Sequence, residues 1–292
     1  MLTVGDTEYW SRQGLYNHLA DMGIAPGDAV MVHAGLRAVG PMLGGPDTLI
    51  EALLDVVGPE GTLLCYLNWE QQYEDALDEE GRLPDALKPH VPPFDPLRSR
   101  ASRDHGFFAE AVRTTPGALR SANPGASVAA IGRRAAWFTA DHPLDYGYGP
   151  GSPFDKLVQV GGKVLMAGAP LDTMSLLHHA EHLAQIPGKR IRRMEVPLLI
   201  DGHRNPESLS GSTVSMEGSL WGPTKWQMIE EFDTADPVVD GLAADYFGTI
   251  VGAFLAAGRG RRGRIGSADS VLVPAAEIVA FGVRWLEERL ST

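Results

Sequence analysis

The sequence has very little cysteine and no long apolar run, and each lack excludes a class of protein. Cys65 is the only cysteine in 292 residues, so an intrachain disulfide is impossible. No stretch reaches the roughly 18 uninterrupted apolar residues that a membrane-spanning helix needs. The first ten residues carry Asp6 and Glu8 where a secretory signal would carry Lys or Arg. We therefore expect a cytoplasmic protein without a membrane partner.

Positive charge is also scarce. Lys and Arg number 25 against 37 Asp and Glu, which gives a net charge of -12. This balance repels nucleic acid and favours cationic partners. The one basic run, residues 259–264, is short, interrupted by glycine and free of aromatic side chains, and we interpret it as a mobile surface loop. The charge pattern thus predicts no nucleic-acid partner.

The remaining composition is that of a globular chain in which helical and strand patterns alternate. It is 44% hydrophobic, enough for a substantial core. Short apolar runs predict buried strands, and apolar residues at helical spacing predict helices. The predicted strands cover residues 29–33, 62–67, 163–167 and 271–273, and the predicted helices cover residues 12–22, 48–57, 107–112, 173–186 and 275–289. This alternation predicts a layered α/β sheet in one domain spanning residues 1–292.

Residues 71–104 break this pattern, because they are rich in Asp, Glu and Pro and show little periodicity. They are too long for an ordinary connection between elements. We interpret them as a surface excursion near a functional site.

A histidine-rich segment follows the predicted strand at residues 163–167. The junction of a strand and a helix is where α/β sheets usually carry their sites. His178 precedes Glu181 by three residues and His182 by four, so the three share one helical face. His178 is a candidate general base, because imidazole titrates near neutral pH. The alternative is a solvated helix face on which the histidines are exposed and Glu181 is a solvated neighbour.

The same letters, His178-His179-Ala180-Glu181-His182, match the H-x-x-E-H pattern of inverted zinc peptidases. Zinc would need a third protein ligand, commonly a downstream carboxylate. Many acidic residues of this chain qualify, so a zinc hydrolase stays open as an alternative.

An acidic pair, Glu231 and Asp233, flanks Phe232. If this segment is extended, the two carboxylates lie on one face. They could hold a polyamine, or one of them could bond the far ring nitrogen of His178 and fix its tautomer. The alternative is a solvated acidic turn.

A glycine-rich loop follows the predicted strand at residues 29–33 and leads into the helix at residues 48–57. Such a loop exposes backbone N–H groups that can hold phosphate oxygens. Since it is neither a dinucleotide-binding fingerprint nor a P-loop, the loop alone indicates only a turn of the chain.

Six segments in order resemble the aminoglycoside 3-N-acetyltransferase family, and the resemblance runs from about Ser11 to the C-terminal helix. Residues 32–40 are similar to the family's V-H-x-S-L-R-x-V-G, and residues 177–181 to its L-H-x-A-E. The other four segments are residues 45–61, 120–132, 148–153 and 231–234. The resemblance implies a mixed sheet flanked by helices, the antibiotic N-acetyltransferase fold rather than the GNAT fold. It also implies a cleft that acetyl-CoA and antibiotic enter from opposite sides.

The resemblance further implies direct acetylation of the 3-amino group of the 2-deoxystreptamine ring, which confers antibiotic resistance. His178 is then the general base, oriented by Glu231 or Asp233, and no metal is required. The residues expected to hold CoA and polarise its acetyl carbonyl are His33, Gly35, Leu36, Arg37, Ala38, Val39, Arg120, Ser121, Ser127 and Ser152, with Arg37 and Arg120 at the phosphates. The residues expected at the antibiotic are Tyr66, Trp69, Glu70, Glu74, Asn123, Asp172, Glu181, Glu231 and Asp233.

The charge of the implied substrate agrees with this site. Aminoglycosides are polycations, which an acidic cleft would concentrate. The same carboxylates favour the ammonium form of the reacting amine, so a base is needed at that nitrogen. Gly35 stands where many family members have Ser, and Asn123 where the family pattern has His. These two departures bear on substrate range and rate rather than on reaction type.

Three classes of function stay open at this point. They are an acetyltransferase acting on aminoglycosides or on another amine, a zinc hydrolase that shares His178, and a binder that sequesters cations without turnover. A monomer or a homodimer is expected.

Overall fold

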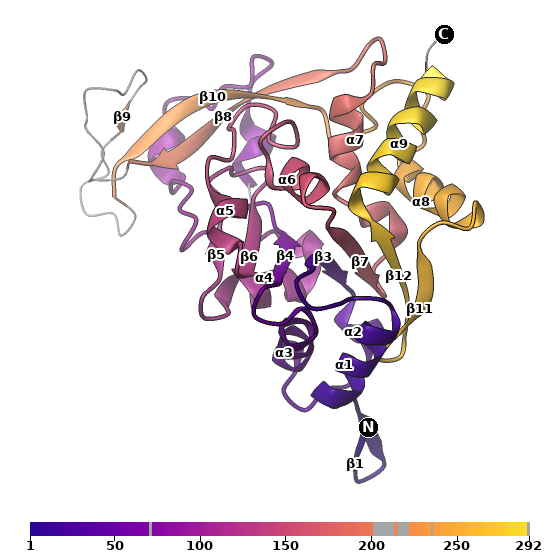
Figure 1. Cartoon of the computed structure of the whole chain (residues 1–292). Coiled ribbons are helices and arrows are strands. Elements are labelled where there is room, and N and C mark those ends of the chain that lie inside the picture. The colour runs from indigo at the N-terminus through magenta and orange to yellow at the C-terminus, as the bar shows by residue number, and fades with distance from the viewer. Residues whose placement is uncertain (70–71, 201–212, 215–221, 235, 291–292) are drawn as a thin grey trace.

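A computed structural model describes residues 1–69, 72–200, 213–214, 222–234 and 236–290. Within them, a seven-stranded sheet forms the centre and helices cover both of its faces (Figure 1). The strand order is β11 (Arg261–Ile265), β12 (Ala268–Pro274), β7 (Lys163–Ala167), β3 (Ala29–Ala34), β4 (Thr62–Tyr66), β6 (Val128–Gly132) and β5 (Leu119–Arg120). β3 runs parallel to β4 and β7, and the other neighbouring pairs are antiparallel. The predicted mixed sheet flanked by helices is confirmed.

One face of the sheet is covered by α1 (Arg12–Asp21), α3 (Pro46–Val57) and α4 (Gly106–Thr114). Local sequence explains where the first two begin. The Ser11 hydroxyl caps α1 by accepting a hydrogen bond from the backbone N–H of Gly14 at 3.2 Å. Pro46 stands at the first position of α3, where a missing N–H costs nothing.

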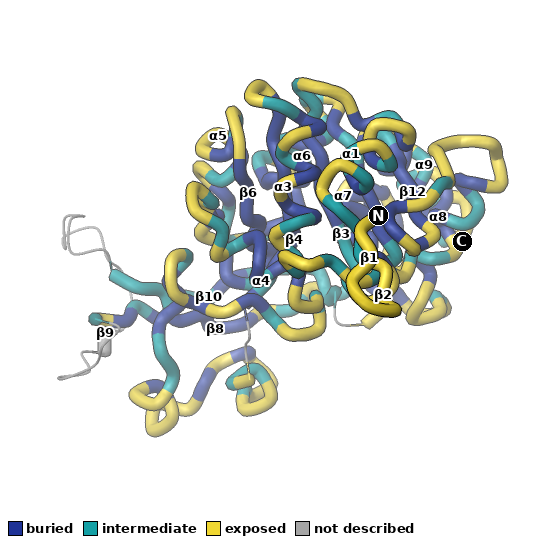
Figure 2. Tube along the Cα trace, turned by 90° about the horizontal axis from the view of Figure 1, so that it is seen from below, coloured by how far each residue is buried: buried dark blue, intermediate teal, exposed yellow. Residues whose placement is uncertain are grey.

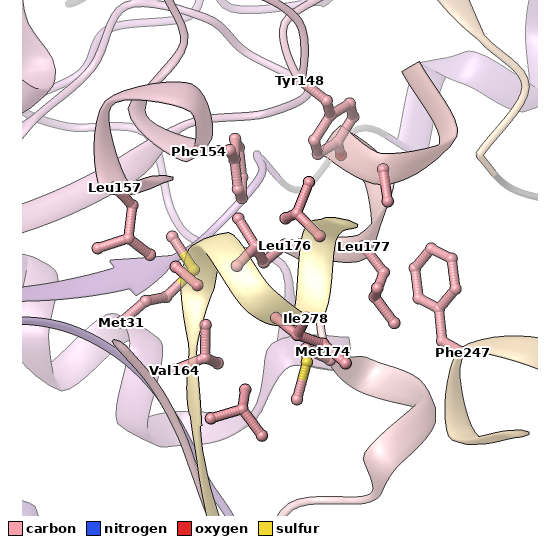
Figure 3. Packing of buried hydrophobic residues seen from close by; sticks show 14 of the residues in the cluster. Met31, Tyr148, Phe154, Leu157, Val164, Met174, Leu176, Leu177, Phe247 and Ile278 are labelled. Carbon is pink, nitrogen blue, oxygen red and sulfur yellow. The ribbon is translucent and has the colours of Figure 1, made fainter. Parts of the chain in front are cut away.

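The other face is covered by five helices: α5 (Ala135–Thr139), α6 (Pro153–Gln159), α7 (Leu177–Leu183), α8 (Tyr246–Ala256) and α9 (Ala275–Leu290). Side chains alternate along β3, so Val30 and Val32 pack under α1 and α3, whereas Met31 packs under α6 and α9. Figure 3 shows Met31 in one cluster with Val164 of β7 and Ile278 of α9. The same alternation places His33 on the face that carries α7.

An arm built on the long strands β8 (Ile191–Leu199) and β10 (Thr224–Phe232) projects from this body in both views (Figures 1 and 2). β9 (Thr213–Val214) pairs with β10 near the end of the arm. The arm has a small apolar cluster of its own, formed by Met194, Val196 and Ile229. Sequence periodicity did not predict the arm.

The predicted excursion at residues 71–104 packs against this arm rather than extending freely. It contains the 3-10 helices η1 (Gln72–Ala76) and η2 (Lys88–His90), and η3 (Arg103–His105) follows. Phe94 forms a bridge with Leu198 of β8. A side chain at Gly81 would meet the carbonyl oxygen of Arg193 of β8, so this contact requires glycine.

Two local predictions were wrong. The basic run at residues 259–264 is largely strand β11, which pairs with β12 at the edge of the sheet. Its exposed arginines and its glycine are typical of an edge strand as well as of a loop, so composition did not separate the two. The helix predicted at residues 173–186 is shorter, because η4 (Leu171–Thr173) and a turn precede α7.

Three smaller elements complete the described fold. β1 (Leu2–Val4) and β2 (Thr7–Tyr9) form an exposed N-terminal hairpin, and α2 (Leu36–Val39) follows β3. Cys65 is a buried free thiol in β4, as predicted. Across the described residues, no helix is both long and apolar enough to span a bilayer.

Candidate functional site

Two adjoining cavities lie where the parallel strands β3, β4 and β7 end. The larger cavity has a volume of about 480 Å³ and the smaller cavity about 170 Å³. Tyr66, Asp104, His105 and Thr173 border both. Because the carboxyl ends of parallel strands are where α/β sheets bind ligands, this is the candidate site. Two ligands held in the two cavities would meet at the shared wall.

His178, near the start of α7, borders the larger cavity. Its Nδ1 lies 2.6 Å from Oε2 of Glu181, one helical turn later, and Glu181 is only 1% exposed. With the carboxylate as acceptor, Nδ1 carries the proton and Nε2 keeps its lone pair. The rings of Tyr148 and Phe247 pack against the imidazole, with centroids 4.7 and 4.8 Å away. The pair is therefore oriented to accept a proton at Nε2.

This geometry differs from the expectation that Glu231 or Asp233 bonds His178. The bonded carboxylate is Glu181, which we had expected at the antibiotic or, in the alternative, in solvent. Asp233 lies outside the cavity wall, with its Oδ2 3.8 Å from Nε of Arg190. The reason is that β10 ends at Phe232, so the alternation that would place residues 231 and 233 on one face stops there.

Glu231 does border the larger cavity, at the end of β10. Its carboxyl accepts hydrogen bonds from the backbone N–H groups of Gly147, Tyr148 and Phe232. Burial raises the pKa of Glu231 to about 7, although these hydrogen bonds and the charge of His178 act in the opposite direction. Near neutral pH the group is thus partly protonated, and a cation in the cavity would favour its carboxylate form.

The larger cavity is acidic overall. Glu74, Asp104 and Asp172 border it together with Glu231, whereas Arg192 is the one Lys or Arg in the described lining. The guanidinium of Arg192 lies 2.8 Å from the Glu74 carboxylate, and burial raises the pKa of Glu74 against the opposing effect of Arg192. Such a wall attracts cations. Glu70, also expected at the antibiotic, lies outside the described residues.

Tyr66 and Asn123 border the larger cavity as expected. The hydroxyl of Tyr66 lies 2.8 Å from that of Tyr148. The Asn123 amide donates to the carbonyl oxygen of Pro143 at 2.7 Å and accepts from the backbone N–H of Ala126 at 2.8 Å. Its polar atoms therefore anchor the cavity wall.

Trp69 does not border the larger cavity. It packs against Tyr73 and Phe94, with ring centroids 5.9 and 5.7 Å away. Its place is in the contact between residues 72–105 and the body of the protein.

Of the residues expected at CoA, His33 and Gly35 border the smaller cavity, and α2 comprises the next four. Within α2, Val39 is fully buried, whereas Arg37 is exposed. Arg37 therefore remains accessible to a phosphate from solvent.

Arg120 lies inside the fold, at 9% exposure. Its guanidinium donates to the Ser127 hydroxyl at 3.0 Å, to the carbonyl oxygen of Ser99 at 2.6 Å and to that of Leu67 at 3.2 Å. These N–H donors are used within the protein, and Arg120 borders neither cavity. The geometry therefore argues against the phosphate contact expected of Arg120.

The serines expected at CoA are also structural in this geometry. Ser121 and Ser127 are fully buried, and the hydroxyl of Ser121 bonds the backbone N–H of Val128 and Nδ1 of His142. Ser152, equally buried, caps α6 by accepting from the backbone N–H of Asp155. None of the three borders either cavity, so these serines make folding contacts here.

The absence of a side chain at Gly35 has a steric cause. A Cβ at this position would lie 2.5 Å from the carbonyl oxygen of Gly168, which follows β7. We expect Gly35→Ala to lower the free energy of unfolding by about 1–3 kcal/mol, because overpacking forces the backbone to shift. Urea unfolding measures this. Gly252→Ala is the control, because its Cβ would meet nothing within 4 Å in α8; equal stability of both variants contradicts the prediction.

Several residues of the site carry no motif and were missed in the sequence. Topology brings them to the cavities from the segment after β4, from η3, from η4 and the turn before α7, and from the arm. They are Asn68, Asp104, His105, Thr173, Ser175 and Arg192.

The residues of the H-x-x-E-H pattern make contacts with different parts of the protein. His178 bonds Glu181, whereas Nδ1 of His179 lies 2.7 Å from the carbonyl oxygen of Tyr148. In the part of the chain that the structure describes, no three His, Cys, Asp or Glu side chains are grouped to hold a metal ion.

Known proteins match this chain over nearly its whole length. The family model for aminoglycoside 3-N-acetyltransferase matches residues 31–287. Aminoglycoside N(3)-acetyltransferase III of Pseudomonas aeruginosa is 44% identical, with 94% of each chain covered. Aminoglycoside N(3)-acetyltransferase VII of Streptomyces paromomycinus is 42% identical, with 96% of this chain and 93% of the relative covered.

Solved structures agree with these relatives. The structure of AAC-IIIb in a binary complex with CoASH has a TM-score of 0.89 at 59% identity and covers 97% of this chain and 98% of its own. That of AAC-VIa bound to sisomicin has a TM-score of 0.85 at 36% identity and covers 98% and 100%. In sequence and in fold, the chain belongs to the aminoglycoside 3-N-acetyltransferase family.

Proposed function

We propose that the protein transfers the acetyl group of acetyl-CoA to the 3-amino group of the 2-deoxystreptamine ring of aminoglycosides and thereby confers resistance. The observation that carries the proposal is the His178–Glu181 pair on the wall of an acidic cavity, beside a second cavity at the end of β3. Relatives that bind CoASH and sisomicin support it. Since acetyl-CoA is available inside cells, the proposal includes a cytoplasmic location.

The larger cavity is the proposed antibiotic site. Glu74, Asp104, Asp172 and Glu231 give it a negative potential, which draws a polycation from solvent. The same potential favours the ammonium form of the bound amines, so a proton acceptor at the reacting nitrogen is needed. His178 supplies that acceptor at Nε2.

The proposed reaction is a direct transfer of the acetyl group from sulfur to nitrogen, with no change of oxidation state. The 3-ammonium group first passes one proton through Nε2 of His178 to solvent. The neutral nitrogen then attacks the thioester carbon, the C–N bond forms, and the oxygen carries the developing charge. Collapse breaks the C–S bond, whose electron pair leaves with the CoA sulfur. The proton from nitrogen passes to Nε2 of His178 and then to the thiolate, giving the amide and CoASH. Buried Glu181 stabilises the imidazolium that forms in between.

Acetyl-CoA would reach this nitrogen through the smaller cavity, next to Gly35 and α2. In this proposal exposed Arg37 binds its phosphates, because a guanidinium offers a planar fork of donors. In this proposal the acetyl group sits at the wall that the two cavities share.

Free-thiol release from acetyl-CoA, measured with a panel of aminoglycosides with and without EDTA, tests the function. We expect release that depends on the antibiotic and resists EDTA, and a product whose added acetyl group NMR assigns to the 3-amino nitrogen. The absence of thiol release with every aminoglycoside of the panel contradicts the proposal. EDTA-sensitive hydrolysis would support a zinc hydrolase, and binding without turnover would support a sequestering protein.

Glu231→Gln should weaken antibiotic binding in a pH-dependent way. Because the pKa of Glu231 is raised to about 7, the free carboxyl is mostly neutral below that pH and charged above it. At pH 8 we expect the KM for the aminoglycoside to rise about tenfold, because the variant loses one hydrogen bond to a charged group. At pH 6 the rise in KM should be much smaller, because the wild-type carboxyl is then mostly neutral. Steady-state kinetics at the two pH values check this. A KM ratio that is the same at both values contradicts the assigned titration.

A further inference from the structure

The penultimate residue of β3, His33, has a buried nitrogen that the fold does not use. Its ring borders the smaller cavity, and Nε2 is shielded from solvent. Among the described residues, this nitrogen has no hydrogen-bond partner. Buried polar atoms are rarely left unpaired, so such an atom beside a cavity indicates a contact made by a ligand.

Among the described residues, the two buried histidines, His142 and His179, are paired. His142 bonds the Ser121 hydroxyl through Nδ1 and the carbonyl oxygen of Gly147 through Nε2. His179 bonds the carbonyl oxygen of Tyr148. Nδ1 of His182 is also unpaired within the described part of the chain, but His182 borders neither cavity. Of the described histidines, only His33 combines an unpaired buried nitrogen with a place on the wall of either site cavity.

The position of His33 relates it to the reacting atoms. It lies on the face of the sheet that carries α7, and so on the side of His178. Tyr66 and Thr173 border its cavity and also the cavity of His178. Under the proposed function, the acetyl group lies at this shared wall, with His178 toward the amine and His33 toward the thioester.

Resting on the proposed function, we propose that Nε2–H of His33 donates a hydrogen bond to the acetyl carbonyl oxygen and stabilises the oxyanion formed when the amine attacks. No atom is transferred to or from His33. The contact strengthens as charge develops on the oxygen, so it acts on the transition state more than on bound acetyl-CoA.

The protonation state of the ring suits a donor that does not titrate. Burial, assisted by nearby His105, lowers the pKa of His33 to about 3, so the ring is neutral at working pH and has one N–H to donate. His105 borders the same cavity, and the remaining titratable groups on it are Asp104, Cys65 and Tyr66. Burial raises the pKa of both Cys65 and Tyr66 to about 12, so neither charges near neutral pH.

A pair of amide variants tests the contact. The side-chain nitrogen of Gln reaches the position of Nε2, whereas that of Asn reaches only the position of Nδ1. We expect His33→Asn and His33→Ala to lower kcat by roughly 10²- to 10³-fold, the usual loss of one oxyanion donor. His33→Gln should recover at least about tenfold of this loss, with the KM for acetyl-CoA and the Kd for CoA nearly unchanged in all three.

The pH profile gives an independent readout. Because a neutral donor is replaced, the loss in His33→Asn should be constant between about pH 6 and 8. His142→Ala is the matched control, since it removes a buried histidine that borders neither cavity, and we expect it to lower stability more than kcat.

The outcomes separate this inference from the proposed function. If the wild-type protein releases no thiol with any aminoglycoside, the function fails. If the wild type is active and His33→Asn matches it within about threefold, or if the Gln and Asn variants have equal kcat, the oxyanion contact is wrong. Should His33→Ala not fold, the comparison of Gln with Asn still decides.

Discussion

Replacing His178 by alanine should lower kcat by roughly 10²- to 10⁴-fold, the usual contribution of a general base. The reason is the geometry of its two nitrogens: Glu181 holds Nδ1, which leaves Nε2 as the acceptor for the amine proton. Binding depends mainly on other residues, so the KM for acetyl-CoA should change little. Thiol-release kinetics at saturating aminoglycoside measure the loss.

His90→Ala is the matched control, because this exposed histidine of η2 borders neither cavity. It should retain wild-type kcat. A His178→Ala variant that turns over at a rate near wild type would show that the amine loses its proton by another route, and the mechanism would be wrong.

The parts of the fold that sequence predicted are those with a clear apolar pattern. β3 and β4 are short apolar runs, and α3 repeats apolar residues at helical spacing, so each pattern has one interpretation. The arm was missed for the opposite reason. Arg192 and Arg193 lie in β8, and Glu230 and Glu231 lie opposite them in β10. These charged residues interrupt the apolar period of both strands.

The site, too, was predicted only in part. The histidine-rich pattern indicated His178, but it could not show which carboxylate would bond its imidazole. Glu181 is buried because α7 packs closely on α9, where a Cβ at Gly282 would already come within 3.0 Å of Leu177. That contact joins segments about 100 residues apart, and no local pattern encodes it.

Arg120 illustrates the converse error. A motif containing an arginine near a predicted nucleotide site suggests a phosphate contact. Instead, this guanidinium joins β5 to the carbonyl oxygen of Leu67, just after β4, and to the hydroxyl of Ser127, just before β6. A motif can thus mark a fold as readily as a ligand. The distinction depends on burial, which only the packed structure reveals.

The partner of His178 is the assignment that structure changed most, and Glu181→Gln tests it. We expect kcat to fall by roughly 10²- to 10³-fold with little change in the KM for the aminoglycoside. A Gln amide that donates to Nδ1 places the ring proton on Nε2, the wrong tautomer for a base, and the buried charge opposite the imidazolium is lost. Steady-state kinetics, with the exposed Glu277→Gln as control, check this.

Comparing Glu181→Gln with Glu231→Gln decides between the two roles, because loss of each carboxylate is expected to change a different kinetic constant. A Glu that orients the base affects kcat, whereas a Glu that meets the cation affects KM. The effects of Glu181→Gln and His178→Ala should also be far from additive, since a residue that acts through His178 has nothing to orient once the imidazole is gone. If Glu181→Gln keeps wild-type kcat and Glu231→Gln loses it, Glu231, one of the two partners that the sequence left open, orients the base, and the bond seen at Nδ1 is not the one that catalysis uses.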